Sequence, residues 1–74
     1  MSKDEVILAL KEIEAIETGI VEQTYVQYKW INGILWLGNY YIEDERQGLA
    51  FPYKDNNISL NDLNNFLNKQ YKFS

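Results

Sequence analysis

The pattern of hydrophobic residues is clearest on either side of Asn32-Gly33, where apolar, β-branched and aromatic residues run in both directions. An Asn-Gly pair between two such runs is typical of a β-hairpin, because a two-residue type I′ turn needs positive φ at both central positions. The pattern therefore predicts a strand over residues 20–30, a tight turn at Asn32-Gly33 and a second strand over residues 34–42.

Counting outward from that turn assigns each side chain to one face of the hairpin, because side chains alternate along a strand. Ile31 then opposes Ile34, and Lys29 opposes Trp36. One face is apolar and is the predicted core side, with Val26, Tyr28, Trp30, Leu35 and Leu37. The other face holds more apolar surface than a solvated face needs, and it carries Tyr25, Gln27, Lys29, Ile31, Ile34, Trp36 and Tyr40.

Helical patterns lie near both ends of the chain. Ser2 and Glu5 have the spacing of a capping box, and Gly19 is the expected residue just past the end of this helix. Between them the apolar residues recur at three- and four-residue steps, at Val6, Ala9, Leu10, Ile13 and Ile16. Ser59 and Asp62 form a second capping box, followed by an apolar stripe of Leu60, Leu63, Phe66, Leu67 and Tyr71.

The remaining segment predicts an acidic turn over residues 43–48 and a short third strand over residues 49–53. Pro52 lacks a backbone N–H, so this strand belongs at a sheet edge. The expected fold is a single α+β domain over residues 1–74, in the order α-β-β-β-α, with a three-stranded antiparallel meander and both helices packed mainly on one face. Such an arrangement leaves the face that bears Trp36 open.

Composition narrows the chemistry. The 74-residue chain contains neither cysteine nor histidine, which excludes disulfide scaffolds, zinc sites built on these ligands, thiol nucleophiles and histidine-dependent triads. The net charge of −4 and the dispersed cations argue against direct nucleic-acid binding. No apolar run approaches the ~18 residues that a membrane span requires, so a cytoplasmic protein is expected.

The most concentrated polar group is Glu43-Asp44-Glu45. Three consecutive carboxylates point in different directions, so a solvated turn is favoured over a divalent-cation site. No pair of carboxylates is predicted to share a cleft, as acid–base catalysis would require. We therefore expect no catalytic, metal or cofactor site and no enzymatic activity.

The hypothesis that follows is a small acidic, non-enzymatic protein-interaction module. The composition is typical of an AT-rich genome, which favours a phage or mobile-element inhibitor or regulator that binds a host or defence protein, or that forms a homodimer. The predicted binding residues lie on the second face of the hairpin and are Tyr25, Lys29, Ile31, Ile34, Trp36 and Tyr40. Aromatic residues of this kind are enriched in protein interfaces.

Two alternatives stay open. In the first, the protein is a homo-oligomer that sequesters a nucleotide-like ligand between aromatic side chains of neighbouring protomers. In the second, it is a DNA mimic that presents an array of carboxylates from the first third of the chain, namely Glu5, Glu12, Glu14, Glu17 and Glu22.

Overall fold

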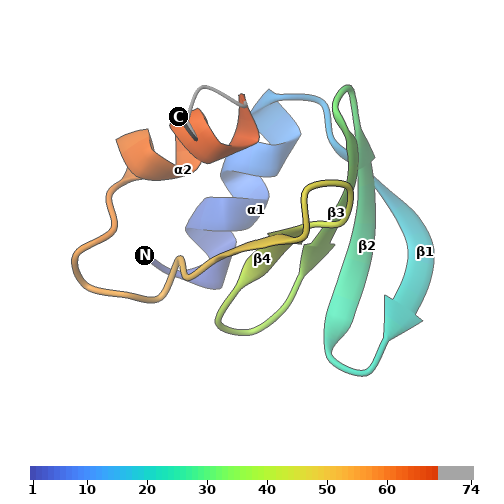
Figure 1. The fold of residues 1–74 in the computed structure, drawn as a ribbon, viewed down its shortest axis with the longest axis horizontal. Coiled ribbons are helices and arrows are strands. Elements are labelled where there is room, and N and C mark those ends of the chain that lie inside the picture. Colours follow the sequence, from blue (N-terminus) through green and yellow to red (C-terminus); the bar gives the residue numbers. More distant parts are fainter. Residues whose placement is uncertain (69–74) are drawn as a thin grey trace.

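The computed structural model describes residues 1–68 and contains, within them, two helices and five strands (Figure 1). The elements in chain order are α1 (Lys3–Glu12), β1 (Ile16–Glu22), β2 (Tyr25–Trp30), β3 (Gly33–Leu37), β4 (Ile42–Asp44), β5 (Leu49–Phe51) and α2 (Leu60–Leu67). The strands form one antiparallel sheet in the order β1-β2-β3-β4-β5. The α+β class is confirmed, whereas the expected meander of three strands is wrong.

Two of the predicted strands turned out to be interrupted. The chain reverses at Gln23-Thr24, because Gln23 adopts a φ of 56° and lets Glu22 pair with Tyr25. It reverses again over residues 38–41, so that Leu37 pairs with Ile42. Neither reversal carries the Asn-Gly signal of a tight turn. The β1–β2 hairpin was therefore predicted as the single strand 20–30, and the β3–β4 hairpin as the single strand 34–42.

The hairpin of β2 and β3 has a different register from the predicted one. Trp30 pairs with Gly33 and Lys29 with Ile34, so the two loop residues are Ile31 and Asn32. Asn32 keeps a negative φ, and the positive φ falls on Gly33 at 134°. The pairing is displaced by two residues, and because side chains alternate with a period of two, both faces keep their predicted members on β2 and β3.

Helix α1 begins as predicted but ends earlier. Ser2 and Glu5 form the capping box, whereas the helix stops at Glu12 and Gly19 lies inside β1. The N–H of Glu14 donates to the Lys11 carbonyl at 3.1 Å and that of Ala15 to the Leu10 carbonyl at 2.9 Å. This is a Schellman motif, and it puts Glu14 in the left-handed region with a φ of 61°.

A glycine suits this position better than glutamate, because a side chain in the left-handed conformation costs about 1 kcal/mol. Glu14→Gly is therefore expected to raise the free energy of unfolding by about 0.5–1 kcal/mol in urea denaturation. Glu12→Gly is the matched control, since it places glycine in the last helical turn and should lower stability by a similar amount. Destabilisation by both substitutions would contradict the assigned helix end.

Strand β1 is an exposed edge strand with a bulge. The register shifts between Glu17 and Val21, so that Thr18, Gly19 and Ile20 together oppose Gln27. The Thr18 hydroxyl donates to Gln27 Oε1 at 2.7 Å and accepts the N–H of Ile20 at 3.3 Å. All seven residues of β1 are exposed, and the strand forms the edge of the sheet that is farthest from both helices (Figure 1). The bulge interrupts the ladder and so discourages pairing with another chain.

The core lies on the face of the sheet that carries Trp30, which we call the inner face. Both helices contribute to it, and its buried members are Val6, Ala9, Leu10, Tyr28, Trp30, Leu35, Leu37, Ile42, Tyr53, Leu63, Phe66 and Leu67. The indole Nε1 of Trp30 donates to the Leu67 carbonyl at 3.0 Å and thereby joins β2 to the end of α2. Strand β5 ends at Phe51, just before Pro52. Tyr71, predicted on the apolar stripe of the second helix, lies outside the described residues.

Both helices are capped by the same reciprocal arrangement. The Ser2 N–H donates to Glu5 Oε1 at 2.9 Å, and the Ser59 N–H donates to Asp62 Oδ2 at 2.9 Å. These backbone hydrogen bonds, aided by the serine hydroxyls, lower the pKa of both carboxyl groups. A carboxylate that accepts such bonds holds its proton less readily in the folded state than in the unfolded state.

This difference predicts a loss of stability in acid. Because the pKa values of Glu5 and Asp62 are lowered by folding, their contribution is complete above the unfolded-state values of about 4 and is lost as the pH falls through the lower folded-state values. The urea midpoint should therefore decrease below about pH 4. A Glu5→Gln/Asp62→Asn variant should lose part of that decrease, and an identical pH profile would contradict the capping role.

Candidate functional site

The side of the sheet opposite the core, which we call the outer face, is the candidate functional surface. Strand register places on it Ile16, Glu22, Tyr25, Gln27, Lys29, Ile34, Trp36, Glu43 and Ala50. Both helices of the described chain, residues 1–68, pack against the inner face. The outer face is therefore a sheet surface that neither helix of residues 1–68 covers, and it carries large aromatic residues.

Trp36 stands at the centre of this face. Its cross-strand neighbours are Gln27 on β2 and Glu43 on β4. The indole Nε1 donates to Glu45 Oε2 at 2.6 Å, and the backbone N–H of Glu45 donates to the Ile34 carbonyl at 3.0 Å. Because the backbone of Glu45 is hydrogen-bonded to β3, its carboxylate holds the indole in one orientation. The Trp36 side chain nevertheless remains half-buried.

Tyr25 is positioned by a close approach to Gly38. A Cβ atom added at Gly38 would lie 2.3 Å from Cε1 of the Tyr25 ring, so the ring packs directly over the glycine. The Gly38 carbonyl accepts a hydrogen bond of 2.6 Å from the Tyr53 hydroxyl. Burial, and to a smaller extent the nearby Tyr25, raises the pKa of Tyr53, which favours the protonated hydroxyl that donates this hydrogen bond.

A hollow of about 350 Å³ opens beside these two rings and is lined by Glu22, Gln23, Tyr25, Trp36, Glu43 and Glu45. Its residues come from the β1–β2 hairpin, β3, β4 and the residue that follows β4. Three of them are carboxylates and two are aromatic, and the lining includes no lysine or arginine. We call this feature the acidic aromatic hollow.

The other end of the outer face is apolar and carries one cation. Lys29 pairs with Ile16 on one side and with Ile34 on the other. Ile16 is 69% exposed, and Ile31, in the adjacent turn, is 94% exposed. The outer face is therefore polarised, with negative charge at the hollow and an apolar, positively charged end near the β2–β3 turn.

The structure brings together four of the six predicted binding residues. Tyr25, Lys29, Ile34 and Trp36 share the outer face. Ile31 was predicted to pair with Ile34, but it lies in the turn. Tyr40 was predicted on the same face of the hairpin as Tyr25. It lies instead in the β3–β4 connection, where it is 66% exposed, because the chain turns at Gly38 and does not continue as a strand.

Sequence reasoning missed the acidic residues of the hollow. Glu43 was assigned to a turn, although it pairs with Trp36 in the middle of the sheet. The signal that identifies it is the i, i+2 spacing of Glu43 and Glu45, which puts both on one face of any strand that begins at Ile42. Glu22, which the sequence suggested only as part of a carboxylate array, and Gln23 could not be placed beside Trp36, because the β1–β2 turn carries no strong turn sequence.

The run Glu43-Asp44-Glu45 is divided between the two faces of the sheet. Glu43 and Glu45 border the hollow, whereas Asp44 is 1% exposed and points to the inner face. Its Oδ1 accepts the backbone N–H of Arg46 at 3.1 Å, which shapes the β4–β5 turn. Within residues 1–68, no cluster of acidic side chains is arranged to hold a metal ion.

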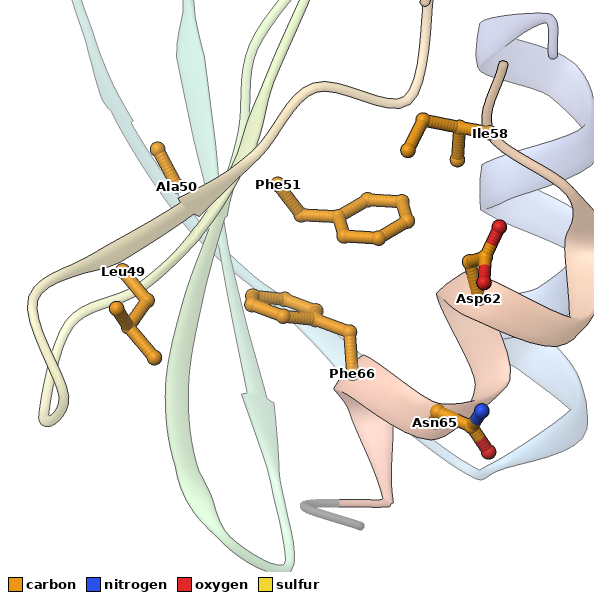
Figure 2. Close-up of a pocket in the computed structure, with 7 residues that line it drawn as sticks. All are labelled: Leu49, Ala50, Phe51, Ile58, Asp62, Asn65 and Phe66. Carbon is orange, nitrogen blue, oxygen red and sulfur yellow. The ribbon is translucent and has the colours of Figure 1, made fainter. Parts of the chain in front are cut away.

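A second hollow, of about 410 Å³, lies between β5 and α2. Figure 2 shows the rings of Phe51 and Phe66 side by side in it, with Asp62 and Asn65 on the helix; the ring centroids are 5.1 Å apart. Phe66 belongs to the core and Phe51 packs against it, and Asp62 already accepts the Ser59 N–H. This hollow is best explained as the open margin of the hydrophobic core.

Neither helix within residues 1–68 has the length and apolarity needed to cross a membrane. No protein-family model matches the chain, and no curated protein and no solved structure shows significant similarity to it.

Proposed function

We propose that this protein is a non-enzymatic interaction module that binds a protein partner through its outer face and acts as a small inhibitor or regulator. The observation that carries the proposal is the contrast between the two tryptophans. Trp30 is part of the core, whereas Trp36 is held by Glu45 on a sheet face that neither helix of residues 1–68 covers. A preoriented, half-buried aromatic residue of this kind is typical of the centre of a protein interface.

Three further features support the proposal. Trp36, Tyr25 and Ile34 supply apolar contact area from adjacent strands. The rigid sheet limits the entropy that is lost on binding. The absence of cysteine suits a reducing compartment, and we propose that the protein acts in the cytoplasm.

The two alternatives receive less support. A nucleotide-like ligand would bring phosphate groups toward Glu22, Glu43 and Glu45, the carboxylates that line the hollow beside the aromatic rings. A DNA mimic needs its carboxylates in one array, but Glu5 is engaged in the cap of α1 and Glu22 lies at the far end of β1.

The test is to replace Trp36 by alanine and to measure binding and self-association. Affinity capture from host lysate with quantitative mass spectrometry, and sedimentation of the purified protein, should show a loss of at least about thirtyfold in whichever association the wild type makes, because central aromatic residues contribute about 2 kcal/mol or more. Circular dichroism should show a folded variant.

Tyr40→Ala is the matched control, because it removes an exposed aromatic side chain that lies outside the outer face. Its binding should stay within about twofold of the wild type. Unchanged association in Trp36→Ala would contradict the proposal, and so would an equal loss in both variants.

A further inference from the structure

We infer that the outer face recognises its partner by taking a lysine or arginine side chain of that partner into the acidic aromatic hollow. This inference rests on the proposed function and adds the chemistry of the partner: a basic protein segment. Three carboxylates and two aromatic rings converge on a hollow whose lining has no cation of its own.

The hydrogen bond of Trp36 decides what the hollow can offer to a ligand. The indole N–H already donates to Glu45, so the ring presents its π surface and has no donor left. Glu43 lies beside Trp36 on the neighbouring strand, and Glu22 pairs with Tyr25. Ionised carboxylates accept hydrogen bonds and donate none, so the hollow is built to receive a donor with positive charge.

The aromatic rings favour the same occupant. A guanidinium or ammonium group is attracted to the face of a tryptophan or tyrosine, and the attraction increases when water is partly excluded. Arginine also pairs with carboxylates through two parallel hydrogen bonds while its plane stacks on a ring. Trp36, Tyr25 and the adjacent glutamates provide both kinds of contact within one hollow.

Charge and surface chemistry favour a protein over other cationic ligands. The apolar end of the outer face, with Ile34 and the exposed Ile16, needs apolar partner surface, which a free cation does not supply. A second copy of the chain is disfavoured, because the protein has a net charge of −4 and, among the strands of residues 1–68, the register places one cation, Lys29, on the outer face.

The experiment is a selection from a random peptide library displayed on phage, with the wild-type protein as bait. Bound peptides should be enriched in lysine and arginine beside apolar residues, and a synthetic copy with citrulline in place of arginine should bind about tenfold more weakly. Glu22→Gln/Glu43→Gln should weaken binding by a similar factor, with Glu45 kept because it orients Trp36.

The control is Glu12→Gln/Glu17→Gln, which changes the net charge by the same amount away from the hollow. Its affinity should stay within about twofold of the wild type. If the selected peptides are neutral and lose binding in Trp36→Ala but not in Glu22→Gln/Glu43→Gln, the inference is overturned and the proposed function stands. If no selected peptide depends on Trp36, both are overturned. Self-association that Lys29→Gln abolishes would also overturn the inference, because the occupant would then be a second copy.

Discussion

Replacing Trp30 by alanine is expected to unfold the domain, whereas the same replacement at Trp36 should cost no more than about 1 kcal/mol. Trp30 is 6% exposed and its Nε1 donates to the Leu67 carbonyl. Removing a buried tryptophan costs about 3–5 kcal/mol, which is comparable to the whole stability expected of a domain this small. Trp36 is only half-buried and does not belong to the hydrophobic core between the sheet and the two helices.

The measurement is urea unfolding followed by far-ultraviolet circular dichroism for both variants. Trp30→Phe serves as the control for ring volume, because it keeps an aromatic ring in the core but loses the hydrogen bond to the end of α2. It should fall between the wild type and Trp30→Ala. Similar losses in Trp30→Ala and Trp36→Ala would show that the two indoles share one layer, and the outer face would then offer no binding surface.

Gly38→Ala is expected to lower the free energy of unfolding by about 2–3 kcal/mol. The new Cβ would lie 2.3 Å from Cε1 and 2.8 Å from Cδ1 of Tyr25, closer than carbon atoms can approach. The backbone cannot easily retreat, because the Gly38 N–H donates to the Tyr41 carbonyl and its own carbonyl accepts the Tyr53 hydroxyl. The Tyr25 ring must therefore move, and with it one wall of the acidic aromatic hollow.

A double-mutant cycle isolates this contact. In a Tyr25→Ala background the ring is absent, and Gly38→Ala should cost less than about 1 kcal/mol. Gly48→Ala is the control: nothing lies within 4 Å of its added Cβ, and its φ of +66° imposes a strain of about 1 kcal/mol that Tyr25→Ala should not relieve. A cost of Gly38→Ala that is equal in both backgrounds would refute the steric explanation.

The predicted division of the hairpin into a core face and an outer face was correct despite the wrong register, for a definite physical reason. The turn was placed at Asn32-Gly33, while the loop is Ile31-Asn32. A displacement of one residue would have moved one strand's side chains to the opposite face and put Trp30 and Trp36 on the same face, but a displacement of two leaves Trp30 inside and Trp36 outside. Tyr40 is the residue for which counting failed, because its assignment assumed that the strand continued past Gly38.

Sequence patterns could not predict how the residues of the acidic aromatic hollow come together, although the spacing of Glu43 and Glu45 places those two on one face of a strand. Glu22, Trp36 and Glu43 belong to three strands, and their proximity depends on the turns at Gln23-Thr24 and at residues 38–41. One of these turns requires a glutamine at positive φ, a conformation that its sequence does not favour. Such a turn forms because the strands on both sides pair and pack, so its position is set by contacts between distant residues.

The sequence by itself determined the two helix starts and the division of the hairpin into a core face and an outer face. Both are local properties: a capping box involves residues three positions apart, and alternation links neighbours along one strand. The tertiary structure alone decided the number of strands, the end of α1 at Glu12 and the grouping of carboxylates around Trp36. The number of strands and the grouping of the carboxylates depend on pairing between strands, and the end of α1 depends on a Schellman motif. These hydrogen bonds outweigh the local preference of residues such as Glu14 and Gln23 to avoid positive φ.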